Sequence, residues 1–106
     1  MRKNNYFSII DAIVDLQERG FFLDFSLVDN KLLCCQEKCF LAAEEFDVLE
    51  MYRFHESHAS SVREETIVYA IESLTRSFKG ILLNSNHQGK AVVHPILTRK
   101  LRKFWA

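Results

Sequence analysis

Two groups of side chains have the types and spacing that binding chemistry requires. The first is acidic and consists of Glu44, Glu45, Asp47 and Glu50. The second is basic and aromatic and consists of Arg99, Lys100, Arg102, Lys103 and Trp105. Two carboxylates can share acid and base work where their burial differs, while cations beside an aromatic ring can contact a phosphate backbone and stack on a base. We interpret both groups as candidate interaction residues, and the simplest arrangement pairs the acids with the basic tail.

Three cysteines, Cys34, Cys35 and Cys39, suggest a metal site at first sight. Adjacent cysteines on a strand point to opposite faces, however, and C-x-x-x-C supplies two ligands where structural zinc needs four. We therefore expect reduced thiols that act as small apolar side chains, with no metal and no cofactor.

A second pattern, His55, Glu56 and His58, resembles H-E-x-x-H, but its second histidine arrives one residue early and the segment is polar and loop-like. The nearby hydroxyl side chains are Ser57, Ser60, Ser61 and Thr66. They lack the tight turn that exposes a catalytic nucleophile. We predict no catalytic residue, and we treat an enzymatic role as open but disfavoured.

The charges are divided unevenly along a chain with a net charge of zero. Residues 1–72 hold all fourteen acids against seven Lys and Arg, and residues 73–106 hold seven Lys and Arg and no acid. Three arrangements can use this division: the tail lies on the acidic body of its own molecule, copies self-associate head to tail or reciprocally, or the tail binds nucleic acid or another anionic partner.

These residues must be positioned by the elements around a central hairpin, Thr66 to Asn86. Both of its apolar runs lack polar alternation, which is typical of strands buried on both faces. Before it, Asp47 to Phe54 has the strand period, in which Val48, Glu50, Tyr52 and Phe54 share one face. The strands Asp47 to Phe54, Thr66 to Leu74 and Gly80 to Asn84 therefore form a predicted meander.

Two helices should cover one face of that sheet. The first runs from Tyr6 to Arg19, is capped by Asn4 or Asn5, ends at Gly20, and has a broad apolar arc that favours burial. The second runs from Pro95 to Phe104, and its proline fits the first helical turn.

The other segments are shorter. Phe21 to Leu27 reads as an extended link that lays aromatic rings on the core, and Leu32 to Cys35 and Cys39 to Phe40 read as short strands. Ala42 to Phe46 has helical composition over about one turn. His55 to Glu65 reads as a long polar loop, and Ala91 to His94 as a short edge strand.

Length and composition fit one α+β domain over residues 1–106, with a mainly antiparallel sheet of three to five strands. With 48% hydrophobic and 26% charged residues, most of the chain should be ordered. Because the apolar runs are short and the odd number of cysteines favours free thiols, we expect a cytoplasmic protein without a signal peptide or membrane span.

Several motifs together resemble a known family. They are G-x-x-x-D-F-x-L from Gly20, E-E-F-x-V-x-x-x-Y-R-F from Glu44, I-x-Y-A-I-x-S from Ile67 and K-G-I-L-x-N from Lys79. The chain resembles, from its first helix to about Asn84, a family of short bacterial proteins without an established function, some of which carry the label phosphoribosylpyrophosphate synthetase. The resemblance implies a shared α+β fold.

The residues themselves argue against the synthetase activity. Gly20, Gly80 and Gly89 are isolated, so the chain lacks the glycine-rich loop that cradles a pyrophosphate. We expect instead a non-enzymatic interaction or regulatory module that binds a protein partner or a second copy. A small-molecule or enzymatic role is the alternative, and nucleic-acid binding by the tail is the third.

Overall fold

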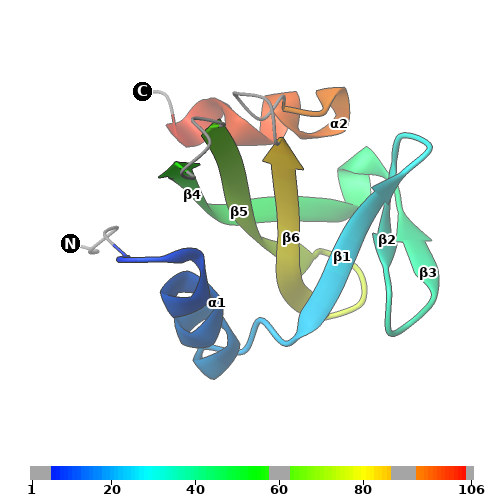
Figure 1. Cartoon of the computed structure of the whole chain (residues 1–106). Coiled ribbons are helices and arrows are strands. Elements are labelled where there is room, and N and C mark those ends of the chain that lie inside the picture. The colour runs from blue at the N-terminus through cyan, green and yellow to red at the C-terminus, as the bar shows by residue number, and fades with distance from the viewer. Residues whose placement is uncertain (1–5, 58–62, 87–92, 105–106) are drawn as a thin grey trace.

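A computed structural model describes residues 6–57, 63–86 and 93–104. The strands are β1 (Leu23–Val28), β2 (Lys31–Cys34), β3 (Cys39–Leu41), β4 (Phe46–Ser57), β5 (Arg63–Ser73) and β6 (Lys79–Asn86). The helices are α1 (Ile9–Glu18), the 3-10 turn η1 (Ala43–Glu45), α2 (Pro95–Thr98) and the 3-10 helix η2 (Arg99–Phe104). This is an α+β arrangement, as predicted (Figure 1).

The six strands form one mixed sheet in the order β3-β2-β1-β6-β5-β4. Two antiparallel meanders, β1–β2–β3 and β4–β5–β6, meet where β1 runs parallel to β6. The prediction of three to five strands was therefore too low, and that of Phe21 to Leu27 as an unpaired link was wrong. Strand β1 has two partners: β2 follows it directly in a hairpin, and β6 lies more than fifty residues downstream, where Leu23 is in register with Gly80.

The central hairpin was predicted correctly. Strand β5 lies between β4 and β6, and every residue from Glu65 to Ile71 is buried. Burial on both faces explains why this stretch lacks polar alternation.

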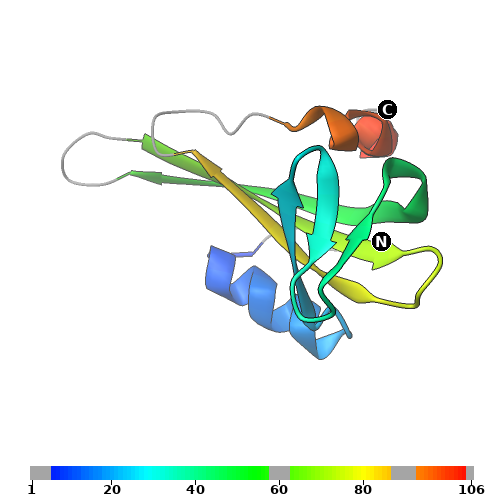
Figure 2. The same cartoon turned by 90° about the vertical axis from the view of Figure 1, so that its right-hand side faces the viewer.

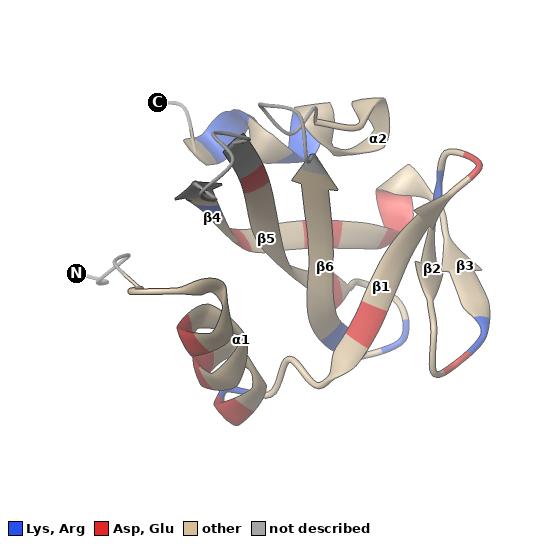
Figure 3. Cartoon of the chain, in the orientation of Figure 1, with Lys and Arg blue, Asp and Glu red and all other residues tan. Residues whose placement is uncertain are grey.

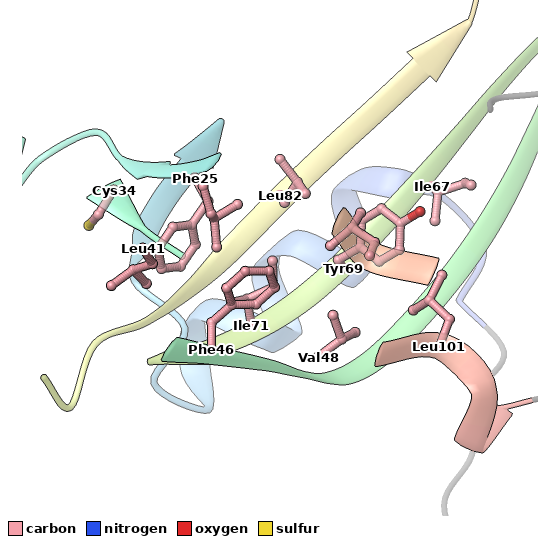
Figure 4. Packing of buried hydrophobic residues seen from close by; sticks show 12 residues of the cluster. Phe25, Cys34, Leu41, Phe46, Val48, Ile67, Tyr69, Ile71, Leu82 and Leu101 are labelled. Carbon is pink, nitrogen blue, oxygen red and sulfur yellow. The ribbon is translucent and has the colours of Figure 1, made fainter. Parts of the chain in front are cut away.

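The larger core lies on one face of the sheet and takes side chains from all six strands. Figure 4 shows Leu41 of β3 and Phe46 of β4, from opposite ends of the strand order, on this one cluster with Ile71. Leu97 of α2 and Leu101 of η2 close the cluster, and both are fully buried. The sheet therefore wraps around this core and the C-terminal helices cover it.

Helix α1 covers the opposite face, contrary to the prediction that both helices share one face (Figure 2). Leu16 and Phe21 pack there against Val68 and Ala70 of β5 and Ile81 of β6. Because β5 is apolar on both faces, its alternate side chains must be buried by elements on both sides of the sheet. The hydrophobic period of a helix shows which side of the helix is buried, but not which face of the sheet it packs on.

Helix α1 also begins later than predicted. Ser8 is its N-cap, and its side-chain oxygen accepts a hydrogen bond from the backbone nitrogen of Asp11 at 3.2 Å. Asn4 and Asn5 lie outside the described residues. Gly20, with φ +104°, ends the helix region as predicted, in a conformation that favours glycine.

A β-bulge in β4 corrects the predicted face of that strand. The register shifts between Val48 and Glu50, so that Val48 pairs with Ile71 but Glu50 pairs with Ala70. Val48 consequently packs in the core under α2, whereas Tyr52 packs under α1. One extra residue reverses every following side chain, and this places Glu50 on the α1 face.

The polar segments differ from the prediction in extent. Strand β4 extends to Ser57 and strand β5 begins at Arg63, so much of the predicted loop His55 to Glu65 is strand. Residues 58–62 lie outside the described part. Of the predicted edge strand, Ala91 and Val92 also lie outside it. His94 is no strand residue, because it caps α2 by accepting a hydrogen bond from the backbone nitrogen of Ile96 at 3.1 Å.

Candidate interaction surface

Among the described residues, the predicted contact between the acidic group and the basic tail exists at one point. Lys103 Nζ lies 2.8 Å from Asp47 Oδ2, and Lys100 Nζ lies 5.1 Å from the centre of the Phe46 ring. Both contacts hold η2 to the start of β4. Trp105 lies outside the described residues.

The other acids of the predicted group are dispersed. Glu45 accepts a hydrogen bond from the backbone nitrogen of Ala42 at 2.7 Å and so serves η1. Glu44 is exposed beside a shallow hollow of about 370 Å³, which Arg99 and Lys100 also line. Glu50 lies on the opposite face because of the bulge. The sequence cluster is thus no single site in space.

Glu50 instead joins a network that fixes α1 to the sheet. The Arg19 guanidinium donates two hydrogen bonds to the Glu50 carboxylate, at 2.7 and 2.8 Å, and a third to Asp15 at 3.0 Å. Tyr6 donates to Asp15 at 2.6 Å, and Tyr52 donates to Glu50. The Tyr6 and Tyr52 rings meet edge to face with centroids 4.9 Å apart. This network ties the segment before α1, its last turn and β4 together.

The protonation states in the network follow from these contacts. Burial, and next the hydrogen bond donated to Asp15, raises the pKa of Tyr6 above its ordinary value. The same hydrogen bond lowers the pKa of Asp15. Burial, and next the bond to Glu50, raises the pKa of Tyr52, and the bond to Glu50 raises that of Arg19. The network therefore keeps the Asp15 carboxylate and the Arg19 guanidinium charged, and it keeps the hydroxyls of Tyr6 and Tyr52 protonated.

We expect these shifts to appear in an alkaline titration. All three tyrosines of the chain, Tyr6, Tyr52 and Tyr69, have a folded pKa raised above 10.0, in each case chiefly by burial. Their protonated state thus contributes stability that is complete below about pH 10 and is lost as the pH rises through the folded pKa values. Tyrosinate absorbance at 295 nm should rise above pH 10, together with the loss of secondary structure seen by circular dichroism. In denaturant all three should titrate near pH 10; equal curves in the two states would contradict the prediction.

The remaining candidate residues have local partners. Arg53 pairs with Glu65 at 3.2 Å, and His55 lies 3.4 Å from the same carboxylate. Cys34 is buried, and burial raises its pKa, whereas Cys35 is exposed, which fits the prediction that neighbouring cysteines take opposite faces. Within residues 6–57, 63–86 and 93–104, no three or more His, Cys, Asp and Glu side chains come together in a group that could hold a metal ion.

A groove on the α1 face was not predicted from the sequence. It has a volume of about 240 Å³, lies between α1 and strands β1 and β6, and is lined by Ile13, Gln17, Asp24, Phe25, Ser26, Ile81 and Leu83. Beyond it, the register of β1, β2 and β3 places Ser26, Leu33 and Phe40 in one row on this face. Phe40 is 50% exposed, so α1 leaves this end of the sheet open.

The elements that form the groove also carry apolar side chains that face solvent. Ile10 and Val14 of α1 are 71% and 47% exposed, and Phe7, just before the helix, is fully exposed. Leu83 on the strand side is 47% exposed. The predicted broad apolar arc of the helix is therefore buried along one side only, at Ala12 and Leu16. We call the groove with Phe7, Ile10, Val14, Asp11 and Glu18 the α1 surface.

Charge distinguishes the α1 surface from the C-terminal side (Figure 3). Residues 6–28 carry four acids against one arginine, and Asp11, Glu18 and Asp24 are exposed. Residues 93–104 carry four cations and no acid. The α1 surface is thus apolar with an acidic border.

One sequence signal could have indicated this surface. The apolar arc of α1 is wider than a single contact with the sheet can bury, and the excess, Phe7, Ile10 and Val14, is what remains exposed. The open row on β1 to β3 could not be foreseen, because it depends on which strands α1 covers.

Comparison with known protein families, with curated proteins and with solved structures finds no match to this chain. Among the described residues, no helix has the length and apolar character needed to cross a bilayer.

Proposed function

We propose that this chain is a non-enzymatic interaction module of the cytoplasm that binds a basic, apolar protein segment on its α1 surface. The observation that carries the proposal is the exposure of Ile10 and Val14 on α1, the helix that supplies Ile13 and Gln17 to the groove, and of Leu83, which lines the groove from β6. Apolar side chains that gather on a surface and are rimmed by polar groups are typical of protein-binding sites. The acids Asp11, Glu18 and Asp24 on the border favour a cationic partner.

The size of the groove fits a side chain of a protein partner better than a small-molecule ligand. Its volume of about 240 Å³ is below the roughly 300–1,000 Å³ of drug-sized ligand pockets. The network of Arg19 with Glu50 supports the same function, because it fixes α1 and so presents a preformed surface.

The test is a titration with a synthetic amphipathic peptide of alternating lysine and leucine blocks, followed by amide shifts in NMR. We expect shifts confined to α1, β1 and β6, and binding that weakens with salt. The variant Ile10→Gln/Val14→Gln should weaken binding by roughly tenfold, because it removes two exposed apolar contacts.

The matched control is Leu74→Gln, since Leu74 is also exposed, at 56%, but lies in the turn between β5 and β6. It should bind the peptide as the unchanged protein does. A peptide in which glutamate replaces lysine should not bind. Equal affinity for the two peptides, or shifts spread over the C-terminal side, would count against the α1 surface.

The two other functions have their own candidate positions. A small anionic ligand would use the hollow beside Glu44, Arg99 and Lys100, and nucleic acid would use Arg99 and Arg102, which are exposed. Nucleic-acid binding would fall steeply with salt and would be lost in Arg99→Glu/Arg102→Glu while peptide binding at α1 persists.

A further inference from the structure

We propose that the basic segment bound by the α1 surface is the η2 helix of a second copy, so that copies of this chain associate head to tail. This rests on the proposed function and adds the identity of the partner. The residues that carry it are Asp11 and Glu18 on α1 and Arg99 and Arg102 on η2.

The first argument is charge complementarity within one sequence. Arg99 and Arg102 are exposed, and neither forms an ion pair with another described residue, whereas Lys103 is occupied by Asp47. Phe104, next to these cations, is 38% exposed. The segment thus offers positive charge beside an aromatic ring, the counterpart of an apolar groove with an acidic border.

The second argument is geometric. Helix α1 and η2 lie on opposite faces of the sheet, with the sheet between them (Figure 2). The basic helix therefore cannot reach the α1 surface of its own molecule. Within one copy the tail meets the acidic body at Asp47, and its two exposed arginines are left to meet the α1 acids of another copy.

The contact joins two different surfaces, so it does not close on itself as a twofold contact does. A row of copies joined in this way still has a free α1 surface at one end and a free η2 at the other. Association should then continue past the dimer as the protein concentration rises, unless the rotation between copies closes a ring.

The experiment is sedimentation velocity on the full chain, with a reductant to keep the exposed Cys35 reduced, over a range of protein concentrations. At low salt the average mass should rise with concentration without a plateau at the dimer, and at about 0.5 M salt it should fall toward the monomer. Arg99→Glu/Arg102→Glu and Asp11→Lys/Glu18→Lys should each weaken association by roughly tenfold or more. The control Lys31→Glu/Arg76→Glu makes the same charge change at two exposed positions away from η2 and should associate as the unchanged protein does.

The decisive step is to mix the two charge-reversed variants in equal amounts. The intact acidic surface of one then meets the intact basic helix of the other, so association should return, which also shows that both variants are folded. If Asp11→Lys/Glu18→Lys does not fold, Ile10→Gln/Val14→Gln takes its place in the same measurement.

A protein that stays monomeric at all concentrations, a dimer that persists in high salt, or a mixture that does not regain association would overturn the head-to-tail contact. If the unchanged protein is monomeric but the lysine–leucine peptide still binds at α1, the interaction module stands and the partner is a different basic protein.

Discussion

Replacing Gly80 with alanine is expected to destabilise the protein by about 3 kcal/mol, at the upper end of overpacking effects, and to lower its Tm by roughly 15 °C. A Cβ at this position would lie 2.2 Å from the carbonyl oxygen of Leu23 and 2.8 Å from Cε2 of Phe25. The first neighbour is backbone of the parallel partner strand, and the second is a core ring. Relief therefore requires β1 and β6 to separate at the junction that joins the two meanders. Unfolding in urea, followed by circular dichroism, measures the loss.

Gly20→Ala is the matched control, because it makes the same chemical change where there is space. The nearest atom to its Cβ would be Lys79 Nζ at 3.8 Å, so the cost comes from the positive φ alone and should be about 1 kcal/mol. A Gly80→Ala protein as stable as Gly20→Ala would show that β1 and β6 do not approach as closely as the structure indicates.

The second large effect is expected for Glu50→Ala, with a loss of about 2–3 kcal/mol. The Glu50 side chain is 13% exposed and accepts hydrogen bonds from both Arg19 and Tyr52, so its removal leaves a guanidinium and a hydroxyl without their main partner. The estimate stays below that for a fully buried pair because Arg19 is one-third exposed. Thermal unfolding at neutral pH measures the effect.

Asp47→Ala provides the comparison, because it breaks an ion pair of similar length at an exposed position. The Lys103 and Asp47 side chains are 46% and 35% exposed, and such pairs contribute under about 1 kcal/mol. High salt should remove the Asp47 effect and leave most of the Glu50 effect. The prediction fails if the two variants lose equal stability, since Glu50 would then be no more than a surface charge.

The same two carboxylates show how far sequence reasoning could reach toward the candidate surface. Asp47 and Glu50 are three residues apart and look like members of one acidic cluster. The bulge between Val48 and Glu50 places Glu50 on the α1 face, opposite to Val48, where its carboxylate pairs with Arg19, while Asp47, before the bulge, pairs with Lys103 of the basic tail. A bulge has no reliable mark in a single sequence, because it depends on the fit between two strands.

The cysteines give the opposite case, in which local rules sufficed. Cys34 is the last residue of β2 and Cys35 follows it directly, and strand alternation predicts that one side chain lies in the core and the other in solvent, as the structure has it. The turn at Gly20 and the start of α2 at Pro95 were also foreseen, since each depends on the backbone preference of one residue.

The α+β class, the central hairpin, the two helical regions and the division of charge can be predicted from the sequence, because local period, turn residues and composition are properties of neighbouring positions. The parallel contact of Leu23 with Gly80, the opposite placement of α1 and η2, and the groove that joins Ile13 to Leu83 could be found only in the folded protein. These features depend on contacts between segments tens of residues apart, and such contacts are selected by how apolar faces cover one another in space. The candidate surface belongs to this second kind, because the apolar arc of α1 is visible in the sequence but the part of it that stays exposed depends on which strands the helix covers.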